Sequence, residues 1–312
     1  MYRLRHIIPA LGACALLAAA CAHNAPQQPA EINLATYNIR YHNGGDSARG
    51  DGWGQRYPHI ANIVKFHDFD IFGTQEGYTV QLEELKEALP GFAYIGVGRD
   101  DGRDAGEHSA IFYRTDLFEV VDSGNFWLSE TPDTPSVGWD AALPRICSWG
   151  HFRHTPSGKE FMMFNLHMDH VGKQARVESA KLVRAMIDSL GRGIPAVVTG
   201  DFNVDQNHES YGTMTADQTL LDSYEAADLV YADNGTFNNF MTDGYSTSRI
   251  DHIFVTPNID VKRYGVLTDT YRTADTTAVK RDLRDAPTEI EIKHYKARVP
   301  SDHFPVEVTL EF

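Results

Sequence analysis

Several short apolar segments of this 312-residue chain stop at, or start from, a polar side chain suited to chemistry. Residues 32–39 alternate apolar and polar side chains in the manner of a half-buried strand, and Asn38 lies near the end of this run. The other strand ends of this kind carry Glu76, Asp201 with Asn203, Asp251, and Asp302 with His303. Polar groups that recur at strand ends in one chain predict a fold that gathers those ends into a single site.

The strongest pair in this set is an imidazole and a carboxylate. Asp302 and His303 directly precede the β-rich run 306–312, and Asp251 lies in the apolar run 250–255. A carboxylate on one strand that faces a histidine on the next keeps the imidazole charged and oriented. We therefore expect Asp251 and His303 to lie side by side.

The periodicity of the sequence predicts a domain that mixes helices and strands. Helical spacing of apolar residues is expected over residues 58–66, 80–89 and 172–190, with stop signals at Pro90-Gly91 and Gly191. Strands are expected over residues 32–39, 69–74, 92–97, 109–113, 118–122, 146–154, 161–167, 194–199, 250–255, 261–268 and 306–312. Continuous apolar strands are typical of sheets buried on both faces, so two packed sheets flanked by helices fit this pattern.

Two stretches lack clear periodicity. Residues 129–144 are rich in Pro, Trp and Gly, and residues 271–300 carry several Lys and Arg. Long irregular segments in a compact domain are usually functional or disordered, so both are candidates for walls of a substrate site.

Composition fits one globular domain, because 42% hydrophobic and 23% charged residues are enough for a sizeable core. The chain has no internal repeat and no Gly/Ser linker. Its net charge is −15, whereas proteins that bind DNA non-specifically usually present a basic surface to the phosphate backbone. Cys147 is the one cysteine beyond residue 21, so we expect a buried small side chain and no disulfide framework.

The strand-end motifs, in their order along the chain, resemble the endonuclease/exonuclease/phosphatase family, which includes DNase I and the inositol polyphosphate 5-phosphatases. The resemblance runs from about Glu31 to Phe312, and its motifs are residues 36–40, 73–76, 200–203, 249–254 and 301–306. It implies a four-layer α/β/β/α sandwich of two packed mixed β-sheets flanked by helices, with the site at one end.

Three of these side chains are expected to hold a metal. Glu76, Asn38 and Asp302 offer oxygen ligands, which suit Mg²⁺, with Mn²⁺ as an alternative. The resemblance likewise implies that Glu76 and Asn38 bind the metal and that Asp302 contributes. No Cys/His cluster has zinc spacing.

The remaining strand-end groups are expected to act on the phosphate. Asp201 would accept a proton from an attacking water, and Asn203 would donate to a phosphoryl oxygen or hold the water. His303, held by Asp251, would stay protonated and stabilise charge that develops at phosphorus. The resemblance implies a similar place for a second imidazole, His167.

Further residues are candidates for substrate contact. The resemblance implies that Tyr113 hydrogen-bonds phosphate, although an ordinary strand aromatic is an equal alternative. Arg40 and Arg145 are candidate phosphate clamps, with a structural ion pair as the alternative for Arg40. Asn165 and Trp139 complete this group.

The N-terminus has the features of an export signal. Arg3 and Arg5 precede an apolar stretch, residues 7–20, that is too short to cross a bilayer as a helix. Residues 18–21, Ala-Ala-Ala-Cys, resemble a bacterial lipobox in which Cys21 becomes the lipidated first residue, although Leu is usual at position 18.

Two alternatives stay open for the cleavage site. Residues 11–14, Leu-Gly-Ala-Cys, match the lipobox better but leave a very short apolar stretch, and simple cleavage after Ala22 is the other. We expect a signal peptide at residues 1–22, a tether at 23–30 and a single catalytic domain at 31–312. The protein is then exported by a bacterium and lipid-anchored to the membrane or cell surface, or otherwise periplasmic or secreted.

We expect a metal-dependent hydrolase that cleaves a phosphomonoester or phosphodiester of a small or lipid-linked molecule by in-line attack of water. The alternative is a DNase I-like nuclease acting on DNA or RNA, which the basic segment 271–300 favours and the acidic charge opposes. A non-catalytic binding protein would have lost site residues, and none is lost. The expected partner is the phosphate ester. Contact with the membrane is expected only through the lipid anchor, and the protein is expected to be a monomer.

Overall fold

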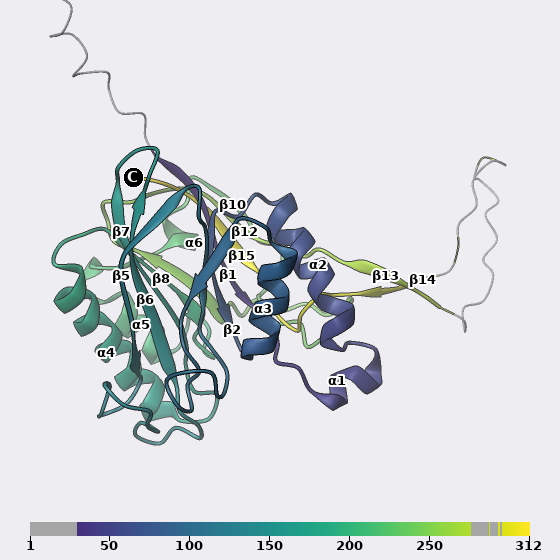
Figure 1. Cartoon of the computed structure of the whole chain (residues 1–312), viewed down its shortest axis with the longest axis horizontal. Coiled ribbons are helices and arrows are strands. Elements are labelled where there is room, and N and C mark those ends of the chain that lie inside the picture. Colours follow the sequence, from purple (N-terminus) through teal and green to yellow (C-terminus); the bar gives the residue numbers. More distant parts are fainter. Residues whose placement is uncertain (1–29, 276–286, 288–292, 294) are drawn as a thin grey trace, which may run out of the picture.

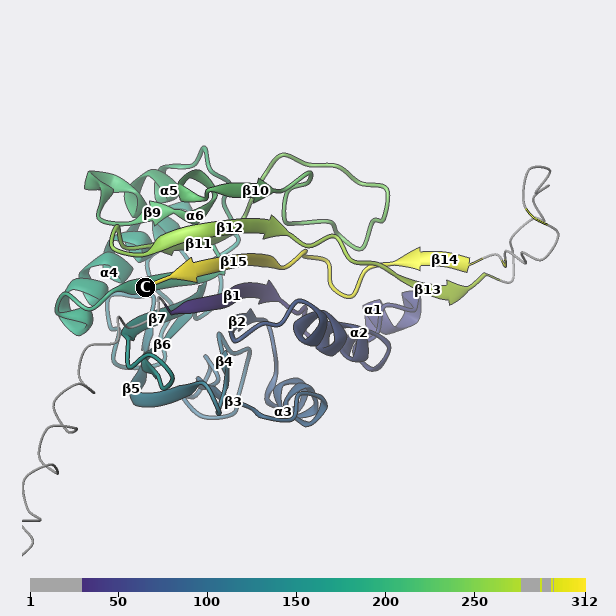
Figure 2. The same cartoon turned by 90° about the horizontal axis from the view of Figure 1, so that it is seen from above.

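Two mixed β-sheets stacked face to face form the centre of the computed structural model, which describes residues 30–275, 287, 293 and 295–312 (Figures 1 and 2). The seven-stranded sheet contains, in spatial order, β10 (Leu229–Tyr231), β12 (Asp260–Val266), β15 (Val306–Glu311), β1 (Glu31–Asn38), β2 (Ile71–Gln75), β4 (Ile111–Arg114) and β3 (Phe92–Ile95). The six-stranded sheet contains β5 (Phe118–Trp127), β6 (Ile146–His154), β7 (Glu160–His167), β8 (Ala196–Asp201), β11 (Asp251–Val255) and β9 (Leu221–Asp222).

Helices cover the outer faces of both sheets. Helices α2 (Trp53–Phe66) and α3 (Thr79–Ala88) share an apolar cluster with the seven-stranded sheet, and α4 (Lys173–Gly191) and α5 (Glu209–Met214) share one with the six-stranded sheet. Shorter helical elements are α1 (Gly44–Arg49), η1 (Ala216–Gln218) and α6 (Ser223–Ala226). The predicted fold class, helices outside two packed mixed sheets, is confirmed.

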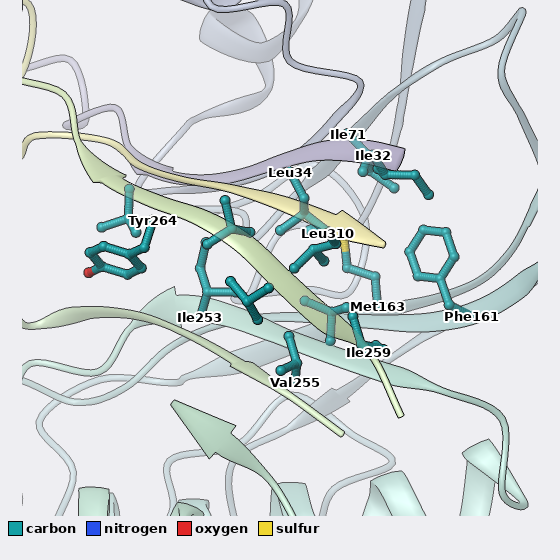
Figure 3. Close-up of a cluster of buried hydrophobic side chains, with 14 of the residues drawn as sticks. Ile32, Leu34, Ile71, Phe161, Met163, Ile253, Val255, Ile259, Tyr264 and Leu310 are labelled. Carbon is teal, nitrogen blue, oxygen red and sulfur yellow. The ribbon is translucent and has the colours of Figure 1, made fainter. Parts of the chain in front are cut away.

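The largest apolar core lies between the sheets. Ile32 and Leu34 of β1 and Leu310 of β15 pack toward Met163 of β7 and Ile253 of β11 (Figure 3). Because side chains alternate along a strand, every second residue of these strands enters this core. The two sheets are therefore held at a fixed spacing, and so are the ends of their strands.

Strand register brings the polar strand ends to one edge of the stack. Strand β1 runs parallel to β2, with Asn38 opposite Gln75, and β7 runs parallel to β8, with His167 opposite Asp201. Strand β11 is antiparallel to β8, so it starts at the same edge with Asp251 opposite Asp201. Parallel neighbours place their carboxyl ends together, which is why residues distant in sequence meet here.

The predicted helices are confirmed, but α2 begins earlier than Pro58, where the sequence predicted its start. The helix starts at Trp53, and the backbone N–H of Gly52 donates to the Gln55 side chain at 3.2 Å in a capping interaction. Pro58 lies inside the helix. Trp53 and Tyr57 do continue the helical spacing of Ile60 toward the N-terminus. The first turn was missed because Gly54 disfavours a helix and Pro58 is typical of a helix start.

The segment 129–144 is irregular as predicted, whereas both ends of 271–300 are not. Strand β13 (Tyr271–Ala274) pairs antiparallel with β14 (Tyr295–Arg298) in a ribbon that projects from the domain (Figure 1). Each strand is too short for period-two alternation to identify it alone. Most of the basic segment between them, and residues 1–29 with the predicted signal peptide, Cys21 and most of the tether, lie outside the described residues.

No helix in the described part of the chain has the length and apolar character that a membrane crossing requires.

Asn165 links the two sheets instead of facing a substrate, so its prediction as a substrate contact is wrong. The side chain is fully buried on β7 and donates to the carbonyl oxygens of Thr74 at 2.8 Å and Ala110 at 2.9 Å. Its oxygen accepts from Gln75 at 2.7 Å and from Thr199 at 3.0 Å. A neighbouring glycine, Gly73, is required because a Cβ there would overlap the Asn165 side chain.

Replacement of Asn165 by Ala should lower the free energy of unfolding by about 3 kcal/mol, because it leaves buried donors and acceptors unpaired in both sheets. Urea unfolding followed by circular dichroism measures this change. The exposed Asn62→Ala on α2 serves as the control and should change the unfolding free energy by less than about 0.5 kcal/mol. Equal stabilities of the two variants would contradict the structural role.

Candidate active site

A cavity of about 580 Å³ opens at the edge of the stack where the strand ends meet. Eight of the residues predicted for the site line it: Arg40, Glu76, Arg145, His167, Asp201, Asn203, Asp302 and His303. Asn38 and Asp251 are fully buried and hydrogen-bond to lining residues from behind. The structure thus brings together residues from both sheets.

His303 is held between two carboxylates, as the sequence predicted for Asp251. Its Nδ1 donates to Asp251 Oδ2 at 2.9 Å, and its Nε2 lies 3.7 Å from Asp201 Oδ2. Burial alone would lower the pKa of His303, but the charges of Asp251 and Asp201 and the hydrogen bond to Asp251 raise it well above its ordinary value. The imidazole is therefore charged at neutral pH.

His167 has the opposite protonation state. Its Nε2 accepts from the Asn203 amide nitrogen at 3.0 Å, and lies 3.5 Å from Asp201 Oδ2. Burial, together with the charges of Arg145 and Arg99, lowers the pKa of His167 well below its ordinary value. The two imidazoles therefore differ in charge, because His303 has a direct hydrogen bond to Asp251, whereas burial and the nearby arginine charges prevail at His167.

Asp201 lies between the two imidazoles and is tied down on both oxygens. Oδ1 accepts from the backbone N–H of Asn203 at 2.8 Å, and Oδ2 accepts from Asn38 at 2.9 Å. Burial and the charge of Asp251 raise the pKa of Asp201 to about 7, against the opposing charge of His303. A carboxylate with this pKa can accept a proton at neutral pH and release it again.

The predicted metal ligands converge on one side of the cavity, where the Arg40 guanidinium lies between Glu76 and Asp302. Arg40 Nη1 lies 3.3 Å from Asp302 Oδ2 and 3.9 Å from Glu76 Oε2, and Nε donates to Asp46 at 3.0 Å. Burial and the charge of Glu76 raise the pKa of Asp302, although the charge of His303 opposes this. Arg40 thus makes the structural ion pairs considered for it while it also faces the cavity.

These residues fit a divalent cation. One atom each of Glu76, Asp201 and His303 lies within 4.8 Å of the others, and Asp302 crowds the same region. Neighbouring buried carboxylates repel each other, and a doubly charged ion would relieve that repulsion. Asn38 is the exception, because its amide nitrogen bridges Glu76 and Asp201 while its oxygen accepts from the Arg40 backbone. Its amide would have to turn over before it could bind a metal.

Four cavity residues adopt left-handed backbone conformations. Arg40, Glu76, Asn203 and Asn239 have φ of 59°, 68°, 52° and 52°. Such conformations are uncommon for residues with a Cβ and cost on the order of 1–3 kcal/mol each. They persist because local bonds hold them, such as the bond from Tyr41 N–H to Glu76 Oε2 at 3.1 Å. Strain concentrated in this way is typical of functional sites.

Arg145 forms the floor of the cavity on the His167 side. It is 4% exposed, its Nε donates to Asp169 Oδ2 at 3.2 Å, and its Nη2 is 2.9 Å from His170 Nδ1. Asp169 is in turn fixed by the backbone N–H groups of residues 142, 171 and 172. Arg145 is thus a rigidly held cation that faces the cavity, as a phosphate or substrate contact requires.

Two predicted substrate contacts do not reach this cavity. Tyr113 lies on β4 opposite Ile71, at the other end of β2 from Glu76, and its ring packs on Phe152 in the core between the sheets. Trp139 lies in the irregular segment, where its backbone N–H donates to Glu130. The prediction for Tyr113 is wrong, and Trp139 is not among the residues that line the cavity. Neither residue could be placed from sequence without knowing the strand register and the path of the loop.

Sequence reasoning missed several residues that line the cavity. Glu107 is paired with Arg99 at 2.6 Å and lies 3.8 Å from His167 Nδ1, and burial raises its pKa to about 7. It sits in a loop with no motif around it. Tyr41 and Tyr78 also line the cavity, and their closeness to Asn38 and Glu76 in sequence was the available signal.

Most of the chain is similar to a known protein family. A profile of the Endonuclease/Exonuclease/phosphatase family matches residues 35–303. A solved family protein from Bacteroides thetaiotaomicron is 62% identical and has a TM-score of 0.84, with 91% of this chain and 99% of that chain covered. A family protein from Bacteroides vulgatus is 37% identical, with a TM-score of 0.77 and the same coverage.

A third solved structure carries a functional name. The mannosyl-6-phosphatase of Bacteroides thetaiotaomicron VPI-5482 is 61% identical, with a TM-score of 0.84, and the match covers 90% of this chain and all of that chain. An uncharacterized protein of Acanthamoeba polyphaga mimivirus is 29% identical over 161 residues, which span 49% of this chain and 60% of that protein. The human Nocturnin catalytic domain, at 17% identity and a TM-score of 0.60, shares the fold.

In the metal-free protein, the His303 imidazole should titrate above the ordinary pKa of 6.5 and the His167 imidazole below it, because their surroundings shift the two pKa values in opposite directions. Since the folded pKa of His303 lies above its ordinary 6.5, its contribution to stability is complete below that pH. The contribution is lost as the pH rises through the folded pKa. Nitrogen-15 NMR of the histidine side chains measures both titrations.

Asp251→Asn should lower the pKa of His303 by removing its strongest charged partner. Asp205→Asn changes a carboxylate bonded to Asn207 and Ser248 instead, and should leave the His303 titration unchanged. A wild-type His303 that titrates near 6.5 would contradict the assignment.

Proposed function

The chain belongs to the Endonuclease/Exonuclease/phosphatase family and is an enzyme that hydrolyses phosphoesters, and on that premise we propose that its substrate is the phosphomonoester of a sugar. The observation that carries the reaction class is the buried row of Asp251, His303 and Asp201 beside the carboxylates of Glu76 and Asp302. The sugar is supported by the 61% identical mannosyl-6-phosphatase, whose whole length this chain matches.

Asp201 and Asn203 are placed to manage the attacking water. Asp201, with a pKa of about 7, accepts the proton that the water loses as it attacks phosphorus. The Asn203 amide nitrogen already donates to His167 and to the Met168 carbonyl at 2.9 Å, so its oxygen is the atom that holds the water. Of the two roles expected for Asn203, holding the water therefore fits better than donating to a phosphoryl oxygen.

The two imidazoles divide the remaining work. His303 carries positive charge and donates to a phosphoryl oxygen, where it stabilises the charge of the transition state. His167 is neutral, and with Nε2 engaged by Asn203 its proton lies on Nδ1, a buried atom 3.8 Å from Glu107. It therefore acts by holding the Asn203 amide in place.

A divalent cation completes the site, and we propose Mg²⁺, or Mn²⁺ as an alternative, because the ligands on offer are oxygen atoms. Glu76 and Asp302 would hold it, with Asn38 after its amide turns over. When bound, the ion would neutralise charge on the phosphate and the leaving oxygen.

We also propose that the protein is exported and held at the bacterial membrane or surface through Cys21, or otherwise released, and that it acts as a monomer. The supporting features are the N-terminal charge pattern and the lipobox-like residues 18–21. Labelling with a clickable fatty acid in cells, compared between the wild type and Cys21→Ser, tests the anchor. Equal labelling of the wild type and Cys21→Ser would show that Cys21 does not carry a lipid anchor.

His303→Ala should reduce kcat on mannose 6-phosphate at least about 100-fold, because it removes the charge that faces the phosphoryl group. Phosphate release with Mg²⁺ measures this loss, and circular dichroism checks that the variant folds. The matched control is His151→Ala. It removes an imidazole on β6 that bonds to Glu160 of β7, and it should keep wild-type activity. Near-normal turnover by folded His303→Ala would remove His303 from the mechanism.

The nuclease alternative is tested with the same preparations. Nicking of supercoiled plasmid that needs Mg²⁺ and His303, without release of phosphate from mannose 6-phosphate, would replace the proposed substrate with DNA.

Chelation should abolish activity, and Mg²⁺ or Mn²⁺ should restore it. Glu76→Gln should raise the Mg²⁺ concentration for half-maximal activity by about tenfold or more, since a charged ligand is lost. Glu83→Gln, a half-exposed acid on α3 paired with Lys86, is the control. Full activity in the chelator would overturn the metal proposal.

A further inference from the structure

One wall of the cavity is an exposed aromatic ring that the fold holds in place. Phe237 lines the cavity and is 43% exposed, although phenylalanine normally avoids water. Its ring lies edge-on to the His303 imidazole, with centroids 5.1 Å apart and planes at 68°. The ring therefore stands immediately beside the group proposed to face the phosphate.

The backbone around Phe237 is bound to the start of the last strand. Phe237 and His303 form an antiparallel bridge, and the Phe304 N–H donates to the Thr236 carbonyl at 2.7 Å. The Asn238 N–H donates to the Asp302 carbonyl at 2.8 Å. The same bonds that position His303 and Asp302 thus position Phe237.

The backbone directly after Phe237 is strained. Asn239 and Phe240 follow in consecutive left-handed conformations, with φ of 52° and 60°. Phenylalanine is poorly suited to that region. The turn is held by the Thr236 hydroxyl, which accepts from the backbone N–H groups of Ile250 at 2.9 Å and Asp251 at 3.1 Å. A strained, well-bonded turn that exposes an aromatic ring indicates a binding role.

The turn also places a polar side chain at the cavity. Asn239 is exposed and lines it together with Phe237. An aromatic face beside an amide matches a pyranose ring, which has C–H groups on its faces and hydroxyl groups at its edge. Because Phe237 adjoins His303, the group that packs on it is the alcohol part of the ester close to the phosphate, which in a sugar 6-phosphate is the pyranose one methylene away from the ester oxygen.

Resting on the proposed function, we infer that Phe237 is the specificity-determining residue for the leaving group: the pyranose of a sugar phosphate packs on its ring, and Asn239 bonds a sugar hydroxyl. Phe237 takes no part in the chemistry. Its removal should weaken binding of substrates that carry the ring and spare substrates that lack it.

The test compares three phosphomonoesters of primary alcohols: mannose 6-phosphate, glycerol 3-phosphate, which has no ring, and adenosine 5′-monophosphate, which has a furanose and a base. Steady-state kcat and KM are measured for the wild type, Phe237→Ala, Phe237→Leu and Phe237→Tyr. Tyr231→Ala, an aromatic 67% exposed on β10 that does not line the cavity, is the control.

We expect Phe237→Ala to lower kcat/KM on mannose 6-phosphate about tenfold or more, mainly through KM, since stacking acts on binding. The value on glycerol 3-phosphate should change little, and Phe237→Tyr should retain the preference for the sugar. If Phe237→Ala fails to fold, Phe237→Leu keeps the apolar volume without the ring and should show the same selective loss.

Other outcomes overturn the inference. Equal losses on mannose 6-phosphate and glycerol 3-phosphate would mean that the ring acts through His303 and not through the sugar. No loss on either would remove Phe237 from recognition while the proposed function stands. A wild type that cleaves glycerol 3-phosphate but not mannose 6-phosphate would end the sugar proposal itself, and a Phe237-dependent preference for the nucleotide would assign the ring to a base.

Discussion

The buried charges around His303 are the interaction on which the site depends. An isolated buried imidazolium would lose its proton, because burial disfavours the charged form. Asp251 of β11 and Asp201 of β8 reverse that preference, and both belong to the six-stranded sheet, whereas His303 precedes β15 of the other sheet. The charged row therefore joins the two sheets at the edge where the cavity opens. The contact that closes the sandwich here is also the one that keeps the imidazole charged.

Two imidazoles on either side of Asp201 are held in opposite states by their neighbours. His303 faces carboxylates, while His167 lies near Arg145 and Arg99 and accepts a hydrogen bond from Asn203. The site thereby has one charged and one neutral imidazole, with a carboxylate between them. This difference in charge lasts only while the arginines near His167 and the carboxylates near His303 keep their positions. Arg145, for example, is held in place by its ion pair with Asp169.

The site is built at a cost in stability that the rest of the molecule offsets. Carboxylates crowd together, and Arg40, Glu76, Asn203 and Asn239 adopt left-handed backbone conformations. The apolar core between the sheets and the buried network of Asn165 hold the edge in shape despite these terms. The polar groups in the centre of the sandwich are hydrogen-bonded to one another. At the edge, charged groups and an aromatic ring are left accessible to a ligand.

The sequence by itself determined most of the strands, the three longest helices, the sandwich class and most of the chemical groups of the site, because hydrophobic periodicity and polar strand ends are local properties. Only the tertiary structure decided what each group does. It placed Asn165, Tyr113 and Trp139 outside the cavity lining, left His303 charged and His167 neutral, turned the Asn38 nitrogen toward its carboxylate neighbours and added Glu107 and Phe237. These outcomes depend on register, burial and distances between residues far apart in the chain, and no local pattern encodes the electrostatic field that such neighbours create.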